Sequence, residues 1–375
     1  MSIAIIRILS SLILILGIIR ANAQSAKLGK PKIDTILTLL KKEMRLQHIP
    51  GLSISVLQNA DLTWGEGLGI TDIENNVPTS SYSEFRTASI AKMFTAVAVM
   101  QLVERGLIDL DKPIDNYCPE FGRKKWPITT RQLLQHQSGV RSYHLINDKE
   151  DSAELYSTKH YNDVLESLEI FKNDSLLFKP GTNFHYTSYG YVLLGCIIQK
   201  VSGVKYSEYM KKSIFEAAGM YHTFPDEPQE IVANRSRGYY ISKDGKLHNS
   251  VYVDMSNKMA AGGFLTTSND LILFTKALLN KKLINSASLN QMFSIQIFSD
   301  GDVVNYGYGC VVNNNNKDFY NLTEVLHGGG TPGVSNLLYI LPEKRFAIAI
   351  LANREDIDDR VDIARNIARI YLNLK

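Results

Sequence analysis

The chain has 375 residues, of which 45% are hydrophobic, so it is long enough to bury a large core in one or two domains. Charged residues make up 21% of the chain. This moderate charge, together with the high hydrophobic content, excludes an intrinsically disordered protein. The formal net charge is +3, and without Arg7 and Arg20, which lie in the leader described next, 39 basic residues face 38 acidic ones. A nucleic-acid-binding protein usually has a strong basic excess, so no nucleic-acid partner is expected.

The first 23 residues have the pattern of a secretory signal. Arg7 precedes a short stretch rich in Ile and Leu, which ends in Ala21-Asn22-Ala23. A basic start, an apolar middle and an A-x-A-like site are typical of a cleaved export signal. We predict cleavage after Ala23, which leaves residues 24–375 as an exported domain, periplasmic or secreted. The apolar run is shorter than the roughly 20 residues that span a bilayer, and an uncleaved N-terminal anchor is the alternative.

The cysteines and histidines indicate neither a disulfide framework nor a metal site. Cys118, Cys196 and Cys310 are too few for a dense framework, and none belongs to a C-x-x-C pair. Cys196 lies in the apolar run YVLLGCIIQ and is interpreted as a buried thiol. The eight histidines show no H-E-x-x-H or similar spacing. No metal and no cofactor are therefore predicted.

The first third of the chain predicts a helix, a hairpin and a second helix. Apolar residues recur at helical spacing over residues 31–47, and Pro50-Gly51 ends that helix. The stretches LSISVLQ and LTWGEGLGI flank Asn59-Ala60-Asp61 and predict a β-hairpin. The apolar stretch over residues 87–103 predicts a helix that ends near Gly106.

The rest of the chain predicts a helical middle and a mixed C-terminal part. Residues from about 107 to 230 are interpreted as mostly helical and rich in loops. The stretch RGYYISKDGKLHNSVYV predicts a second hairpin with Asp244-Gly245 in its turn. A capping box over residues 267–270 opens an apolar helix. Two strands, SNLLYIL and RFAIAILAN, flank residues 342–344, and a last amphipathic helix covers roughly residues 357–373.

This order predicts an α+β fold of the sandwich type. A helix and a hairpin stand at the start, and strands and helices stand at the end, with the helical middle between them. The simplest arrangement is an antiparallel sheet built from both chain ends with flanking helices, plus an inserted, mostly helical subdomain at roughly residues 107–230. The run Asn313 to Asn316 is interpreted as a loop.

The stretch RTASIAKMFTAVAVM, residues 86–100, has a lone lysine in an apolar helix. A charge in a helix that is apolar on all faces is costly to desolvate unless it has partners. Ser89 and Lys92 are three residues apart and share a helix face. Burial can make a lysine a proton acceptor for a nucleophilic serine. The motif alone is weak, because a second S-x-x-K, Ser202 to Lys205, lies at a glycine-containing helix end and is interpreted as a turn.

A second signal is the Y-x-S formed by Tyr186 and Ser188 in FKPGTNFHYTSYGYVLLG, on a polar loop just before an apolar helix. A tyrosine near an ammonium group can have a lowered pKa, which suits it to general-base catalysis. The alternative is an aromatic anchor of the loop. His185 is adjacent, but alternation would point its side chain elsewhere. The competing Y-x-N, Tyr371 to Asn373, is interpreted as structural.

A third signal is LHGGGTPGVSNLLYIL, in which His327 is followed by three glycines and then by a strand. Glycines let a substrate approach the backbone, whose N–H groups can stabilise an oxyanion. The competing K-D-G, Lys243 to Gly245, lies at a hairpin tip and is interpreted as a turn.

The three motifs in this order resemble the serine β-lactamase and penicillin-binding protein superfamily, and most of all its class C-type branch, which has tyrosine in the second motif. The resemblance covers nearly all of residues 30–370 and includes TTRQLLQHQSG and YVDMSNKMAAGGFLTTSNDL. The chain looks most similar to the mitochondrial serine β-lactamase-like proteins. The resemblance implies an antiparallel sheet with helices on its faces, a helical subdomain, and a site between them.

The resemblance also implies the roles of the site residues. Ser89 would be the acylated nucleophile. Lys92 and Tyr186 would share proton transfer, with Tyr186 as the base toward Ser89 and later toward the deacylating water. The N–H groups of Ser89 and Gly330 would form the oxyanion hole. The remaining residues that would contact substrate are Ser188, His327 and Gly329.

Two departures from the class C pattern bear on the substrate. True class C β-lactamases carry a lysine at the position of His327, and a lysine is a permanent cation for the substrate carboxylate, whereas an unperturbed histidine is mostly neutral at pH 7. They also usually carry asparagine at the position of Ser188. Both differences favour an esterase or peptidase over a β-lactamase. His136, in QLLQHQSG, resembles a structural motif of the family and is placed outside the site.

We therefore expect an exported serine hydrolase that cleaves an ester or peptide bond of a small-molecule or peptide substrate through a Ser89 acyl-enzyme. One alternative is a β-lactamase or D-Ala-D-Ala carboxypeptidase that acts on cell-wall-like substrates. An alternative of another class is a penicillin-binding sensor or scaffold that is acylated without turnover. Slow deacylation would distinguish that alternative from an enzyme.

Overall fold

The computed structural model describes residues 30–59, 61–143, 145–146, 149–150, 152–298 and 302–374. The expected leader, residues 1–23, lies outside the described residues. Within the described ranges, no helix combines the length and the apolar character that a bilayer span requires.

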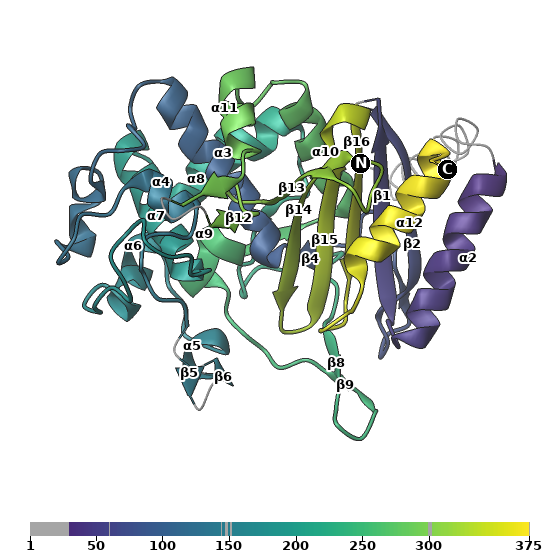
Figure 1. The fold of residues 1–375 in the computed structure, drawn as a ribbon. Coiled ribbons are helices and arrows are strands. Elements are labelled where there is room, and N and C mark those ends of the chain that lie inside the picture. The colour runs from purple at the N-terminus through teal and green to yellow at the C-terminus, as the bar shows by residue number, and fades with distance from the viewer. Residues whose placement is uncertain are drawn as a thin grey trace, which may run out of the picture.

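The centre of the fold is a seven-stranded antiparallel sheet with the order β13-β14-β15-β16-β1-β2-β3 (Figure 1). Strand β1 pairs with β16, with Ile54 opposite Ile350, and this pairing joins the two chain ends. The predicted sheet from both chain ends is therefore confirmed. The strands are β1 (Gly51–Gln58), β2 (Asp61–Asp72), β3 (Val77–Pro78), β13 (Val311–Asn316), β14 (Leu322–Thr331), β15 (Val334–Leu341) and β16 (Phe346–Ala352).

Both faces of the sheet are covered, which explains why its central strands are apolar on both sides. In β15, Leu338 and Ile340 belong to the core on one face, and Leu337 and Tyr339 belong to the core on the other. The second face packs against helices α2 (Lys30–Leu46) and α12 (Arg360–Leu372), which lie side by side in Figure 1. The first face packs against α3 (Ala91–Glu104) and α10 (Ser268–Leu279).

The middle of the chain forms the predicted helical region beside the sheet (Figure 1). Its longest helix, α7, packs against α3 and α9. Its elements, with the turns that lead into and out of it, are η1 (Ala88–Ile90), η2 (Ile114–Asn116), η3 (Pro119–Phe121), α4 (Thr130–Leu134), α5 (Ser152–Leu155), α6 (Val164–Ser167), η4 (Leu168–Ile170), α7 (Ser188–Ser202), α8 (Tyr206–Tyr209), the π-helix η5 (Met210–Glu216), η6 (Ser256–Lys258) and α9 (Met259–Gly262).

Small sheets complete the fold. The hairpin of β8 and β9 turns at Asp244-Gly245 as predicted, with Gly245 at φ +80°. Thr267 caps α10 by accepting from the Asp270 N–H, which is one of the two hydrogen bonds of the predicted capping box. The small sheets comprise β4 (Phe85–Arg86), β10 (Phe264–Thr266) and β7 (Phe224–Pro225); β5 (Leu145–Ile146) and β6 (Lys149–Glu150); β8 (Tyr239–Ile241) and β9 (Leu247–Asn249); and β11 (Gln296–Ile297) and β12 (Val303–Val304). Helix α11 (Ser286–Met292) and turn η7 (Pro342–Lys344) follow α10 and β15.

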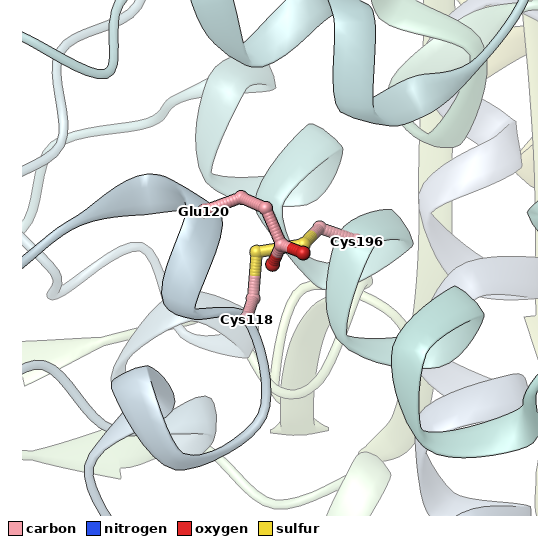
Figure 2. Close-up of side chains that lie close together, drawn as sticks. All are labelled: Cys118, Glu120 and Cys196. Carbon is pink, nitrogen blue, oxygen red and sulfur yellow. A yellow bond between two sulfur atoms is a disulfide. The ribbon is translucent and has the colours of Figure 1, made fainter.

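Two expectations from the sequence about the fold are wrong. Cys196 is not a thiol, because it forms a disulfide with Cys118, from which it is separated by 78 residues (Figure 2). Glu120 lies beside this disulfide, but a disulfide has no thiolate to offer a metal ion. The asparagine run is not a loop, because Asn313 to Asn316 end strand β13, where the register shifts and Asn315 has φ +46°.

Candidate active site

Ser89 lies in the short turn η1, between strand β4 and helix α3. The preceding residue, Ala88, has φ +45°, a left-handed conformation that costs a residue with a Cβ about 1–3 kcal/mol. Thr87 fixes this turn: its N–H donates to the Phe264 carbonyl at 2.7 Å, and its hydroxyl donates to the Gly262 carbonyl at 3.3 Å. The neighbouring elements thus hold the serine in a strained turn just before a buried helix.

Lys92 lies in the first turn of α3 and is completely buried, as the apolar residues around it led us to expect. Its Nζ donates to the Ser89 hydroxyl at 3.1 Å, to the Ala261 carbonyl at 3.2 Å and to the Ser188 hydroxyl at 3.4 Å. The same nitrogen lies 4.8 Å from the centroid of the Tyr186 ring. The structure therefore brings together the first two sequence motifs around one ammonium group.

The electrostatic environment of Lys92 favours its neutral form. Burial, with a smaller contribution from the charge of Lys258, lowers the pKa of Lys92 to about 7. A lysine with such a pKa exists in both protonation states near neutral pH, which is what an exchange of protons with a serine hydroxyl requires.

The second motif is positioned by the N-terminus of α7. Ser188 is the first residue of this helix, and the Thr187 side chain caps it by accepting from the Gly190 N–H. His136 is buried beneath the loop: its Nδ1 accepts from the Thr187 N–H at 3.1 Å, and its ring centroid lies 4.3 Å from that of Tyr186. His136 does not line the pocket described below, so it supports Tyr186 from behind.

The third motif lies on strand β14. His327 is 5% exposed; its Nδ1–H donates to the Gly328 carbonyl at 2.6 Å, which leaves Nε2 to accept from the Tyr306 hydroxyl at 3.0 Å. Burial and the charge of Lys92 lower the pKa of His327 to about 3, so the ring is neutral at physiological pH. Gly329 packs on the Ser89 turn, since a Cβ there would stand 2.5 Å from the Thr87 carbonyl oxygen, whereas a Cβ on Gly330 would meet nothing within 4 Å.

A pocket of about 270 Å³ opens beside Ser89. Of the predicted residues, Ser89, Tyr186, Ser188 and Gly330 line it, whereas Lys92, His327 and Gly329 lie behind its wall. His185 also lines the pocket, so the expectation from alternation is wrong: this segment precedes a helix and is not a strand. The other lining residues are Ala88, Ser142, Tyr143, Leu155, Met255, Lys258, Ala261, Gly262 and Thr331.

Lys258 is a charged lining residue that the sequence reasoning missed. It belongs to the stretch YVDMSNKMAAGGF and is 3% exposed. A charge immediately before the apolar run MAAGGF was visible in the sequence, but the direction of its side chain was not. The arrangement as a whole offers a serine hydroxyl, a partly deprotonated amine and glycine backbone around one cavity, which suits nucleophilic attack on a carbonyl carbon.

Residues 37–372 match the family profile described as Beta-lactamase. The chain belongs to the beta-lactamase family. It is thus a member of the serine hydrolase superfamily that also contains the penicillin-binding proteins, as the three motifs predicted.

Relatives and solved structures agree with this membership. The mitochondrial serine beta-lactamase-like protein LACTB of Bos taurus is 34% identical over 314 residues, which are 66% of this chain and 56% of that protein. The chain thus spans little more than half the length of this curated relative. The octameric penicillin-binding protein homologue of Pyrococcus abyssi has a TM-score of 0.77 at 27% identity, covering 91% of this chain and 77% of that one. The D-stereospecific amidohydrolase of Streptomyces sp. has a TM-score of 0.71 at 25% identity, and the match covers 87% of this chain and 95% of that one.

Proposed function

We propose that the protein is a serine hydrolase that cleaves ester or amide bonds through an acyl-enzyme on Ser89. The observation that carries this proposal is the 3.1 Å contact between the Ser89 hydroxyl and the buried Nζ of Lys92, at the wall of a pocket that Gly330 also lines. A hydroxyl is a weak nucleophile until a neighbouring base takes its proton. A lysine whose pKa is near 7 can do so at neutral pH.

The reaction follows from this geometry in two steps. Ser89 Oγ attacks the carbonyl carbon while its proton moves to Lys92, and the N–H groups of Ser89 and Gly330 stabilise the oxyanion. Collapse of the tetrahedral intermediate breaks the ester or amide bond, and the leaving group takes a proton from Tyr186. Water then attacks the acyl group and gives its proton to the Tyr186 phenolate, and Ser89 Oγ takes its proton back from Lys92 as the acid product leaves. The 3.1 Å contact with Ser89 supports Lys92 as the first base.

The neutral His327 favours esters and amides over β-lactams. A class C-type β-lactamase would use a cation at this position, and this imidazole is held neutral between Tyr306 and the Gly328 carbonyl. The likeness to a D-stereospecific amidohydrolase supports amides as substrates. A β-lactamase or D-Ala-D-Ala carboxypeptidase and an acylated sensor are the alternative functions.

Hydrolysis of p-nitrophenyl butyrate by residues 24–375, with Ser89→Ala in parallel, tests the proposal. We expect turnover in the parent protein and its loss in the variant, together with an acyl adduct on the Ser89 peptide by mass spectrometry. Equal activity of both proteins would refute the assignment of Ser89. A stable adduct without turnover would instead support the sensor or scaffold function.

We further propose that residues 1–23 are an export signal and that residues 24–375 form the hydrolase domain. The Cys118–Cys196 disulfide supports an oxidising compartment, where such bonds persist. Determining the N-terminal residue of the protein purified from its native cell tests this, and an intact Met1 would contradict it.

A further inference from the structure

A groove of about 500 Å³ follows the pocket of Ser89 along the chain: Leu155 lines the pocket, and the next residue, Tyr156, lines the groove. The two cavities share no lining residue. The groove is lined from α5 and from the β8–β9 hairpin, which project from the same side of the molecule (Figure 1). Its lining residues are Ala153, Tyr156, Tyr240, Val251, Tyr252 and Glu355.

The tyrosines of this groove come from three separate segments. Tyr156 follows α5, Tyr240 lies in β8, and Tyr252 follows β9. Tyr156 is 40% exposed and Tyr252 is 56% exposed, so a large part of each side chain is open to a ligand. The Tyr240 ring stacks on the His248 ring with centroids 5.5 Å apart, which holds it in place. Rings that remain exposed around a cavity offer apolar surface and a negative π-face to a ligand.

Glu355 gives the groove a negative charge. Its Oε1 accepts from the Ser250 hydroxyl at 2.6 Å and from the Gly333 N–H at 2.8 Å, which ties the β14–β15 turn to the segment after β9. Its Oε2 has no hydrogen-bond or ion-pair partner among the described residues. Within the described ranges, no lysine or arginine lines this groove. The carboxylate is therefore available to a cation that enters the groove.

An aromatic wall with one carboxylate selects a cation that carries apolar groups. The negative faces of tyrosine rings attract an ammonium group, and this attraction increases when the cation is desolvated. Alkyl groups on the nitrogen make desolvation less costly and contact the rings themselves. An anion would be repelled by Glu355, and a neutral apolar group would gain nothing from its charge. An alkylammonium group is therefore the ligand chemistry that uses both features of the groove.

We propose that this groove binds an alkylammonium group, such as the trimethylammonium group of choline, between the tyrosine rings and the Glu355 carboxylate. The inference goes beyond the proposed function, because Ser89 takes no part in it. The group can belong to a soluble small molecule or to a lipid headgroup, and the experiments below distinguish these two sources.

The test compares choline with its neutral isostere, 3,3-dimethyl-1-butanol, in ligand-observed NMR titrations of the parent protein. We expect the Kd of choline to be lower than that of the alcohol by about tenfold or more, because only choline has a charge for the rings and the carboxylate. The two ligands have nearly the same shape and apolar surface, so the ratio of their affinities isolates the contribution of the charge.

Substitutions assign the binding to the groove. Glu355→Gln keeps an acceptor for Ser250 and Gly333 but removes the charge, and it should weaken choline binding by about fivefold without affecting the alcohol. Tyr252→Leu should weaken choline binding by about threefold, and Tyr252→Phe should keep it. Because Tyr252 is exposed, its variants test the groove even if Glu355→Gln fails to fold.

Glu230→Gln and Tyr221→Leu are the matched controls, since both side chains are exposed and neither lines the groove. Both variants should bind choline as the parent protein does. The inference is overturned if the parent protein does not bind choline, or if it binds the alcohol equally well. Choline binding that Glu355→Gln and Tyr252→Leu leave unchanged overturns it too.

Co-sedimentation with phosphatidylcholine vesicles distinguishes the two sources of the group. Vesicle binding that Glu355→Gln weakens assigns the alkylammonium group to a lipid headgroup. Choline binding without vesicle binding assigns it to a soluble ligand. None of these measurements involves hydrolysis, so they test the groove separately from the assignment of Ser89.

Discussion

Gly329 lies so close to Thr87 that a Cβ on the glycine would stand 2.5 Å from the threonine carbonyl oxygen. Strand β14 and the Ser89 turn are therefore in backbone contact, and this contact sets the position of the nucleophile relative to Gly330. Any side chain at position 329 separates the two elements.

Gly329→Ala is accordingly expected to lower the free energy of unfolding by about 1–3 kcal/mol, because the strand or the turn must shift, and to reduce ester hydrolysis strongly. Gly330→Ala is the matched control, since its Cβ would meet nothing within 4 Å. Urea unfolding and p-nitrophenyl butyrate hydrolysis measure both effects. Equal stability of the two variants would contradict the close packing.

The pH dependence of acylation reports the protonation state of Lys92. With its pKa lowered to about 7, the neutral amine that accepts the Ser89 proton increases from pH 6 to pH 8, so kcat/KM for a neutral ester should rise with a midpoint near 7. His327, with a pKa of about 3, does not titrate in this range. A rate that instead falls above pH 7 would show that the protonated lysine is needed and that Tyr186 is the first base.

Lys258 affects the same profile through its charge. Because the charge of Lys258 contributes to lowering the pKa of Lys92, Lys258→Met should move the midpoint for a neutral ester to higher pH. Lys212→Met, on the exposed surface of the π-helix η5, should leave it in place. A midpoint that stays unchanged in Lys258→Met would mean that the two ammonium groups do not interact.

Lys92 is expected to reduce stability while serving catalysis. Its pKa of about 7 in the folded protein lies below the ordinary lysine value of 10.5, so the unfolded chain binds more protons between these pH values. The burial penalty is therefore complete below pH 7 and fades toward pH 10.5. Lys92→Met should therefore raise the melting temperature more at pH 6 than at pH 9, while abolishing turnover. A variant less stable at both pH values would indicate that the hydrogen bonds of Lys92 outweigh its desolvation.

The Cys118–Cys196 disulfide should stabilise the fold substantially. It closes a loop between residues separated by 78 positions, for which the chain-entropy relation gives about 4.5 kcal/mol. Replacing both cysteines by serine should lower the free energy of unfolding by about this amount. Reductant should destabilise the parent protein and a Cys310→Ala variant, but not the double variant. If the double variant resists urea as well as the parent, the bond is not formed in solution.

Sequence periodicity was sufficient to predict most of the fold. The helix over residues 31–47 and the hairpin around Asn59 are present because one apolar face, or one turn signal, decides the local structure. The prediction of a loop for the asparagine run was wrong because pairing with β14 outweighs the weak strand propensity of asparagine. The disulfide was missed because the two cysteines meet only through the packing of α7 on the preceding loops, and spacing carries no information about that contact.

The site residues that belong to a sequence motif could be predicted. The residues that reach the pocket wall only through the fold could not. Lys92 was identified because a lone charge in an apolar helix needs a reason. His185 and Lys258 reach the pocket through a loop before α7 and a turn before α9, and neither direction follows from a local pattern. The neutrality of His327 depends on Tyr306, which is 21 residues away in the sequence.

The contact between the first and last described helices brings the two ends of the described chain close together. Lys32 Nζ on α2 donates to the Tyr371 carbonyl on α12 at 3.1 Å, so a short linker could join residue 374 to residue 30. A permuted chain opened at Asp244-Gly245 would carry the strands from β13 to β3 as one uninterrupted segment. The sheet would then form between neighbours in sequence, and we expect the permutant to fold faster than the parent, because its contact order is lower.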